Sequence, residues 1–107
     1  MPIFLIGYMG SGKSTIGNDL SQIMNASFID LDNLIENELG LDICDIFHQK
    51  GEYFFRKQEQ YYLTSFNYTQ NMIMAVGGGT PCFFDNMHFM NTVGITIYLK
   101  VSCEELV

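Results

Sequence analysis

Positive charge is scarce in this 107-residue chain, which has five lysine and arginine residues against twelve aspartate and glutamate residues. The net charge of −7 argues against a surface that binds nucleic acid or an anionic membrane, because both need clustered cations. An anionic ligand would have to be held locally, by backbone N–H groups, Mg²⁺ or a few cations such as Lys13 and Arg56. The composition therefore leaves a small anionic molecule as the partner to look for.

Paired cysteines and long apolar runs are also missing. The three cysteines, Cys44, Cys82 and Cys103, are odd in number and follow no disulfide or zinc spacing, so we expect reduced thiols in a cytoplasmic protein. No apolar run approaches the roughly 20 residues of a membrane span. The N-terminus runs directly into a predicted strand, which leaves no room for a signal peptide. Without linkers, repeats or low-complexity segments, residues 1–107 are expected to form a single domain.

The stretch 7–14, Gly-Tyr-Met-Gly-Ser-Gly-Lys-Ser, has the G-x-x-x-x-G-K-[ST] spacing of a phosphate-binding P-loop. An apolar run at 3–6 predicts a strand before it, and 15–24 predicts a helix after it. Its glycines let backbone N–H groups turn toward a phosphate, and the helix dipole adds positive charge at the same point. Lys13 would reach the β- and γ-phosphates, and Ser14 would hold Mg²⁺. The alternative is a glycine-rich turn without a ligand.

Strand and helix patterns alternate along the rest of the chain, which predicts an α/β fold with a parallel sheet. The first helix is expected to carry Ile16, Leu20 and Ile23 on one face, and the aromatic residues of the longest helix are expected to be core or half-buried. The further strands are predicted at 27–30, 72–76 and 94–99, and the further helices at 31–39, 42–49, 52–67 and 85–90.

The last residues carry a helix-start signal, the capping box Ser102-Cys103-Glu104-Glu105, two residues before the chain stops. One turn of helix does not form usefully alone, so we expect the chain to be cut inside a helix and to be part of a larger domain. The alternative is a frayed natural C-terminus.

Polar and glycine residues follow three of the predicted strands. Asp30 and Asp32 follow the second strand, and the triple glycine 77–79 follows the third. Because ligands bind outside the carboxyl ends of parallel strands, these residues are expected to meet the P-loop at one sheet edge. One carboxylate could bind Mg²⁺ and the other could accept a proton from a substrate hydroxyl. Asp32 could equally cap the following helix, and the triple glycine could be a plain turn.

Arg56, the only arginine, lies on the longest predicted helix, four residues after Glu52 and three before Glu59. Either carboxylate could orient its guanidinium to bind a carboxylate or phosphate. The residue pattern alone favours an exposed helical arginine instead. The lone histidines His48 and His88 have no ligand spacing and are expected at the surface or at positions where polar partners satisfy them.

Taken together, these residues resemble shikimate kinase. The resemblance rests on the opening Ile-Phe-Leu-Ile-Gly-Tyr-Met-Gly-Ser-Gly-Lys-Ser-Thr-Ile-Gly, Phe28-Ile29-Asp30-Leu31-Asp32, Ile46-Phe47, Gly51-Glu52, Phe55-Arg56, Glu59 and Gly77-Gly78-Gly79, in the family's order and spacing. It implies a P-loop kinase of the nucleoside-monophosphate-kinase type, with a three-layer α/β/α architecture, here truncated after the fourth strand. The implied reaction converts ATP and shikimate to ADP and shikimate 3-phosphate, in the route to aromatic amino acids.

The resemblance also implies a role for each matching residue. Asp32 would bind shikimate hydroxyls and act as the base, Arg56 would bind the shikimate carboxylate, and Glu59 would orient Arg56. This reverses the interpretation of Arg56 that its pattern alone favours. The implied nucleotide site is Gly10, Ser11, Gly12, Lys13, Ser14 and Thr15, the Mg²⁺ ligands are Ser14 and Asp30, and the further shikimate contacts are Gly78 and Gly79.

What the family has beyond this point is missing here: an arginine-bearing lid, a fifth parallel strand, an adenine-binding loop, a last helix and a second arginine for the carboxylate. We therefore expect the parent protein to be active and monomeric, and this chain to be inactive or nearly so and prone to self-association through an exposed sheet edge. The rival interpretations are a related kinase of the gluconate type and a non-catalytic nucleotide-binding module.

Overall fold

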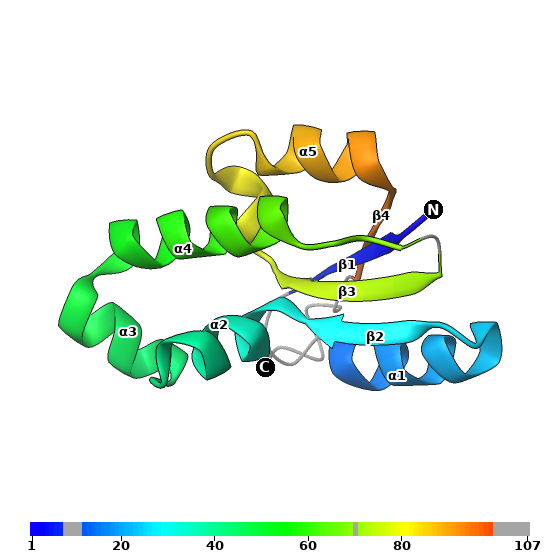
Figure 1. Cartoon of the computed structure of the whole chain (residues 1–107), viewed down its shortest axis with the longest axis horizontal. Coiled ribbons are helices and arrows are strands. Elements are labelled where there is room, and N and C mark those ends of the chain that lie inside the picture. The colour runs from blue at the N-terminus through cyan, green and yellow to red at the C-terminus, as the bar shows by residue number, and fades with distance from the viewer. Residues whose placement is uncertain (8–11, 70, 100–107) are drawn as a thin grey trace, which may run out of the picture.

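A parallel four-stranded sheet forms the centre of the computed structural model, which describes residues 1–7, 12–69 and 71–99 (Figure 1). The strand order is β2-β3-β1-β4, and every neighbouring pair is parallel. The described sheet therefore confirms the predicted α/β class. The strands are β1 (Ile3–Gly7), β2 (Ser27–Asp30), β3 (Met72–Gly77) and β4 (Ile95–Tyr98).

The helices lie close to their predicted positions. A short 3₁₀ turn, η1 (Thr80–Cys82), follows the triple glycine and was not predicted. The predicted capping box at 102–105 lies outside the described residues. The helices are α1 (Lys13–Met24), α2 (Leu31–Leu39), α3 (Ile43–Lys50), α4 (Glu52–Ser65) and α5 (Asn86–Val93).

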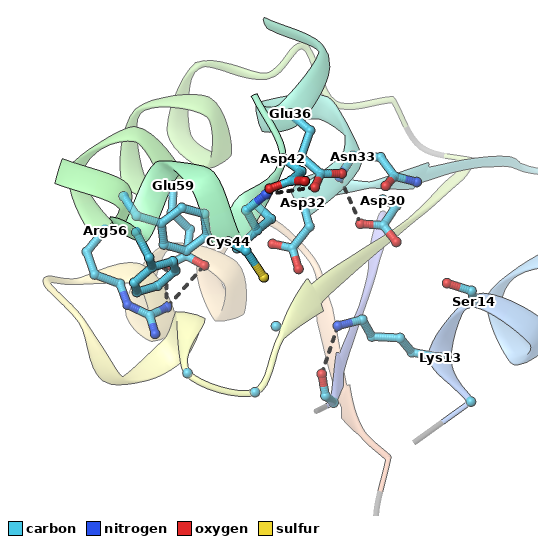
Figure 2. Close-up of a pocket in the computed structure, with 18 residues that line it drawn as sticks. Lys13, Ser14, Asp30, Asp32, Asn33, Glu36, Asp42, Cys44, Arg56 and Glu59 are labelled. Carbon is cyan, nitrogen blue, oxygen red and sulfur yellow. Dashed lines mark hydrogen bonds and ion pairs between the residues drawn. The ribbon is translucent and has the colours of Figure 1, made fainter. Parts of the chain in front are cut away.

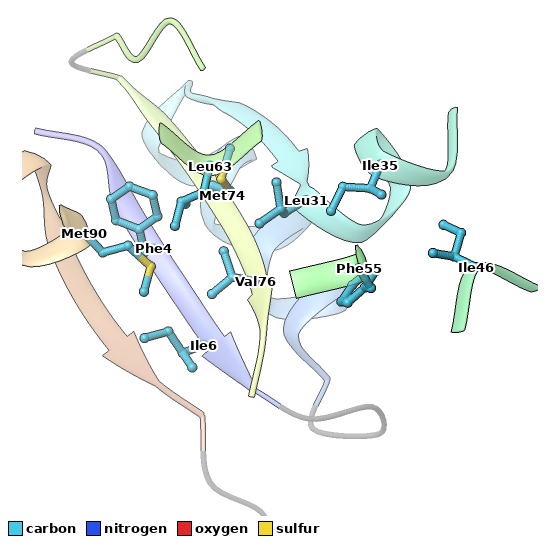
Figure 3. Close-up of a cluster of buried hydrophobic side chains, with 10 residues drawn as sticks. All are labelled: Phe4, Ile6, Leu31, Ile35, Ile46, Phe55, Leu63, Met74, Val76 and Met90. Atoms are coloured by element: carbon cyan, nitrogen blue, oxygen red, sulfur yellow. The ribbon is translucent and has the colours of Figure 1, made fainter. Parts of the chain in front are cut away.

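The sheet is covered by helices on both faces, with α4 and α5 on one side and α1 on the other (Figure 1). Side chains alternate between the faces of a strand. One set from β1 and β3 therefore joins α2, α4 and α5 in the main core, while Leu5, Ile73 and Ala75 are fully buried on the α1 side. The core in Figure 3 comprises Phe4, Ile6, Leu31, Ile35, Ile46, Phe55, Leu63, Met74, Val76 and Met90.

The face of α1 that carries Ile16, Leu20 and Ile23 is not the face that packs on the sheet. Ile16 is 38% exposed and Ile23 is 80% exposed, whereas Gly17 and Ser21 are the buried residues of this helix. The physical reason is close approach: the Phe28 ring lies where a Cβ on Gly17 would stand. A helix this near the sheet turns its small residues inward, which a count of apolar positions does not detect.

The aromatic residues of α4 are only partly as expected. Phe55 is buried and Phe54 and Tyr62 are half-buried, but Tyr53 and Tyr61 are exposed. The reason is geometric, since a helix packed on one side of a sheet cannot bury aromatic residues all round its circumference. Among residues 1–7, 12–69 and 71–99, no helix reaches the length and apolar character needed to cross a membrane.

Candidate active site

A cleft of about 840 Å³ opens at the carboxyl edge of the sheet. Figure 2 shows Lys13 and Ser14 on one side, Arg56 and Glu59 on the opposite side, and Asp32 between them. The predicted convergence of P-loop, acidic pair and triple glycine is thus confirmed. The described lining is Gly7, Gly12, Lys13, Ser14, Asp30, Asp32, Asn33, Glu36, Asp42, Ile43, Cys44, Phe47, Phe55, Arg56, Glu59 and Gly77–Gly79.

The P-loop end of the cleft is built from the end of β1 and the start of α1. Gly12 has φ +82°, a left-handed conformation that favours glycine, and it directly precedes the first residue of the helix. The Lys13 Nζ donates to the Gly7 carbonyl oxygen at 2.9 Å, which directs the ammonium into the cleft. Thr15 is exposed and does not line the cleft, while Gly10 and Ser11 lie outside the described residues.

Asp30 and Asp32 take different structural positions at the start of α2. Asp30 is the helix cap, because its Oδ1 accepts the Asn33 backbone N–H at 3.2 Å. The alternative that Asp32 merely caps this helix is therefore wrong. Asp32 is half-buried in the first turn, and its Oδ1 is buried without a hydrogen-bond partner in the described part of the chain. Asp32 lines the cleft, and its side chain is not used to cap the helix.

Burial raises the pKa of Asp32 above its ordinary value of 3.8. The Lys13 ammonium opposes that rise, whereas the neighbouring carboxylates Asp30, Glu59 and Glu36 add to it. A carboxylate whose pKa is raised is a stronger proton acceptor than a solvated one. Asp32 therefore has the electrostatic surroundings of a general base.

Arg56 is held by a buried carboxylate. Its side chain is only 15% exposed, so the expectation of an exposed helical arginine is wrong, and Glu59 is 1% exposed. The Arg56 Nη1 donates to Glu59 Oε1 at 3.1 Å and to Oε2 at 3.3 Å. The Nη2 has a looser pair with the exposed Glu52 at 3.6 Å, and the buried Nε has no partner within the described residues. Arg56 lines the cleft, and its Nη2 has only this looser pairing.

Two further contacts restrict the Arg56 guanidinium. It stacks over the Phe83 ring, with 4.3 Å between Cζ and the ring centroid. On another side it packs against Gly79, where an added Cβ would lie 2.9 Å from Nη2. Gly79 has φ −86°, which any residue can adopt, so glycine is needed here for close approach rather than for backbone conformation. The triple glycine is more than a plain turn.

Three residues that sequence reasoning missed support this arginine. Thr80 Oγ1 donates to Glu59 Oε2 at 2.6 Å, and Asn86 Nδ2 donates to the Thr80 carbonyl oxygen at 3.0 Å. Phe83, which follows η1, supplies the stacking ring. The only sequence signal was the position of Thr80 directly after the triple glycine. Cys44 was likewise noted only as a thiol, yet it is exposed and lines the cleft.

Oxygen donors for a metal ion lie at the P-loop end of the cleft. Ser14 and Asp30 both line it, although the Asp30 Oδ1 is already used by the helix cap. In the part of the chain that the structure describes, no cluster of three or more His, Cys, Asp or Glu side chains could enclose a metal alone.

Comparison with known proteins gives one consistent match. The family model for shikimate kinase matches residues 9–107. A curated shikimate kinase from Parabacteroides distasonis is 48% identical over 104 residues, which is 97% of this chain and 60% of that protein. One from Azobacteroides pseudotrichonymphae is 50% identical over 105 residues, covering 97% of this chain and 62% of that protein. The chain thus spans about 60% of the length of these curated relatives.

Solved structures of shikimate kinases also match this chain. A crystal structure of shikimate kinase from Bacteroides thetaiotaomicron has a TM-score of 0.90 at 42% identity, over 95% of this chain and 58% of that one. A shikimate kinase from Acinetobacter baumannii, solved in complex with shikimate, has a TM-score of 0.91 at 35% identity, over 97% of this chain and 58% of that one. With a family model matching nearly its whole length, the chain belongs to the shikimate kinase family.

Proposed function

We propose that the protein containing this chain transfers the γ-phosphoryl group of ATP to a hydroxyl of shikimate. The observation that carries the proposal is that one cleft contains both the P-loop Lys13 and the Arg56–Glu59 pair, with Asp32 between them. A lysine at a helix N-terminus suits a polyphosphate, and a fixed guanidinium suits a carboxylate. A substrate that spans the cleft would be a carboxylic acid bearing a hydroxyl.

The P-loop end would bind the nucleotide. In this proposal Lys13 contacts the β- and γ-phosphates, and the backbone N–H groups of residues 10–14 surround them. Ser14 and Asp30 would hold Mg²⁺, with Asp30 acting through water because its Oδ1 caps α2. When bound, the ion would neutralise charge on the β- and γ-phosphate oxygens.

The opposite end would bind shikimate. Arg56 would donate to the substrate carboxylate, and the glycine loop at 78–79 would let the ring approach the backbone. Asp32 would accept the proton of the reacting hydroxyl as its oxygen bonds to the γ-phosphorus and ADP leaves. The carboxylate at one end and the phosphate at the other would fix which hydroxyl reacts.

A coupled ADP-release assay on the longer protein that contains this chain tests the proposal. We expect turnover with shikimate at ordinary kinase rates, about 1–100 s⁻¹, and none above background with gluconate, which has a carboxylate but no ring. Faster turnover with gluconate would indicate that the substrate is another hydroxy acid and not shikimate. Nucleotide binding without turnover on either would favour a non-catalytic module.

The 107-residue chain by itself is expected to bind ligands but to turn over slowly. Its only arginine, Arg56, is placed at the carboxylate end, so none remains to stabilise charge on the transferred phosphoryl group. Loss of such an arginine costs about 10³–10⁵ in rate in related phosphoryl transfer. We also propose a cytoplasmic location, since ATP and the free thiols Cys44 and Cys82 suit that compartment.

A further inference from the structure

A short chain of buried polar groups runs behind Arg56. Glu59 is 1% exposed, Thr80 is fully buried and Asn86 is 1% exposed. Such groups are costly to bury unless they are hydrogen-bonded to one another. They come from three separate elements, since Glu59 lies on α4, Thr80 begins η1 and Asn86 begins α5.

The contacts in this chain are short and directional. Glu59 Oε2 accepts the Thr80 hydroxyl at 2.6 Å and also receives Arg56 Nη1 at 3.3 Å, while Oε1 receives the same nitrogen at 3.1 Å. The arginine alone would leave the carboxylate free to turn about its last side-chain bond, because both oxygens meet one nitrogen. The Thr80 hydroxyl distinguishes the two oxygens and so sets the plane of the carboxylate.

The backbone position of Thr80 adds a second consequence. Thr80 directly follows Gly79, on which the guanidinium packs, and its own carbonyl is held by Asn86 at 3.0 Å. The Thr80–Glu59 bond therefore ties the glycine loop to α4 across 21 residues of sequence. The proposed function assigns the shikimate carboxylate to Arg56 and the ring to the glycine loop. The Thr80 hydroxyl links these two parts of the site through Glu59.

We propose that Thr80 is a positioning residue: through Glu59 it sets the orientation of Arg56, and it fixes the glycine loop at the distance that a planar carboxylate requires. This inference rests on the proposed function for the identity of the ligand, but its structural half concerns only residues of this chain. A charged hydrogen-bonding group that is held in advance loses less entropy on binding, so removing the hydroxyl should weaken carboxylate recognition selectively.

The sequence offers a direct probe of Arg56, because a chain with a single arginine has a single Nε–H signal in a ¹H–¹⁵N spectrum. In the unaltered chain we expect that signal to be sharp and slow to exchange with water. Thr80→Val, which removes the hydroxyl and nearly keeps the shape, should broaden it or speed its exchange. Thr80→Ser, which keeps the hydroxyl, should restore it.

Binding provides the second readout, measured on the same chains by titration with shikimate and with the analogue whose carboxylate is reduced to a primary alcohol. We expect Thr80→Val to lose about fivefold to tenfold in affinity for shikimate while its affinity for the alcohol and for ADP is unchanged. A merely destabilised chain would lose affinity for all three. If Thr80→Val does not fold, Thr80→Ala removes the same hydroxyl without introducing a second methyl.

The outcomes distinguish a failure of the positioning role of Thr80 from a failure of the proposed function. An unchanged Nε–H signal together with unchanged shikimate affinity in Thr80→Val would overturn the positioning role. If the unaltered chain shows no preference for shikimate over the alcohol, the proposed function fails at the carboxylate. A loss of the sharp signal in Thr80→Val would still establish that Thr80 positions Arg56.

Discussion

Adding one methyl group at Gly79 should displace Arg56 and little else. A Cβ there would lie 2.9 Å from Nη2 and 3.3 Å from both Cζ and Nη1. Ordinary contact begins near 3.5 Å, so the guanidinium must retreat by roughly 0.6 Å. The backbone does not oppose Gly79→Ala, because φ is −86°. Because the displaced guanidinium is stacked on Phe83 and paired with the buried Glu59, the loss in unfolding free energy should be about 1–3 kcal/mol.

The effect on binding should be specific to shikimate. A hydrogen bond to a charged group contributes about 1.5–3 kcal/mol, and a displaced guanidinium makes such bonds poorly. We expect Gly79→Ala to weaken shikimate binding about tenfold to a hundredfold, measured by isothermal titration, with ADP affinity unchanged.

The matched control is Gly77→Ala, at the end of β3 in the same triple glycine. A Cβ on Gly77 would meet only the Thr80 hydroxyl oxygen, at an ordinary contact distance of 3.6 Å. This variant also changes the cleft lining, yet it leaves Arg56 in place, so it should bind shikimate within about twofold of the unaltered chain. If Gly79→Ala bound shikimate normally, or Gly77→Ala lost as much affinity, close packing on Arg56 would not explain the glycine.

Three further changes test other parts of the site. Asp32→Asn should lower turnover of the longer protein about 10²–10⁴-fold. Because burial raises the pKa of Asp32, its ionised form destabilises the folded state. The contribution of Asp32 to the free energy of unfolding therefore falls as the pH rises from 3.8 through the raised pKa. Asp32→Asn should therefore be the more stable protein at pH 7 but not at pH 3 in urea unfolding, and equal stability at pH 7 would contradict this. Lys13→Met should weaken ADP binding at least about tenfold and spare shikimate, whereas loss of both would indicate misfolding. The exposed Ile97 lies on the edge strand of the described sheet, so sedimentation should show self-association of the 107-residue chain that Ile97→Lys reduces; a monomer before the change would refute this.

Local patterns predicted the elements well, because the signals for strand, loop and helix ends lie within a few residues of one another. Gly40 and Gly51 end α2 and α3 at positive φ, directly after the predicted range 31–39 and two residues after the predicted range 42–49, and Asp42 caps α3 through the Asp45 N–H. The same reasoning failed for Ile16 and Ile23 on α1, where a contact with a distant strand decided which face was buried.

The residues of the candidate site also fall into those that local sequence patterns predicted and those that they did not. Lys13 and Ser14 were predictable because the P-loop is continuous in sequence, and its chemistry depends on backbone conformation that glycine spacing encodes. Arg56 was not, because helical spacing to Glu52 and Glu59 is equally compatible with a solvated surface. Only the family resemblance favoured a binding role, and that role is still a prediction.

By itself, then, the sequence determined a parallel α/β fold and a P-loop followed by acidic and glycine segments, because each depends on neighbours within one or two turns of chain. The tertiary structure decided that Asp30 rather than Asp32 caps α2, and that Arg56 is enclosed by Glu59, Phe83 and Gly79. These outcomes depend on how closely separate elements approach, and a bond such as Thr80 to Glu59, 21 residues apart, leaves no periodic trace in the sequence.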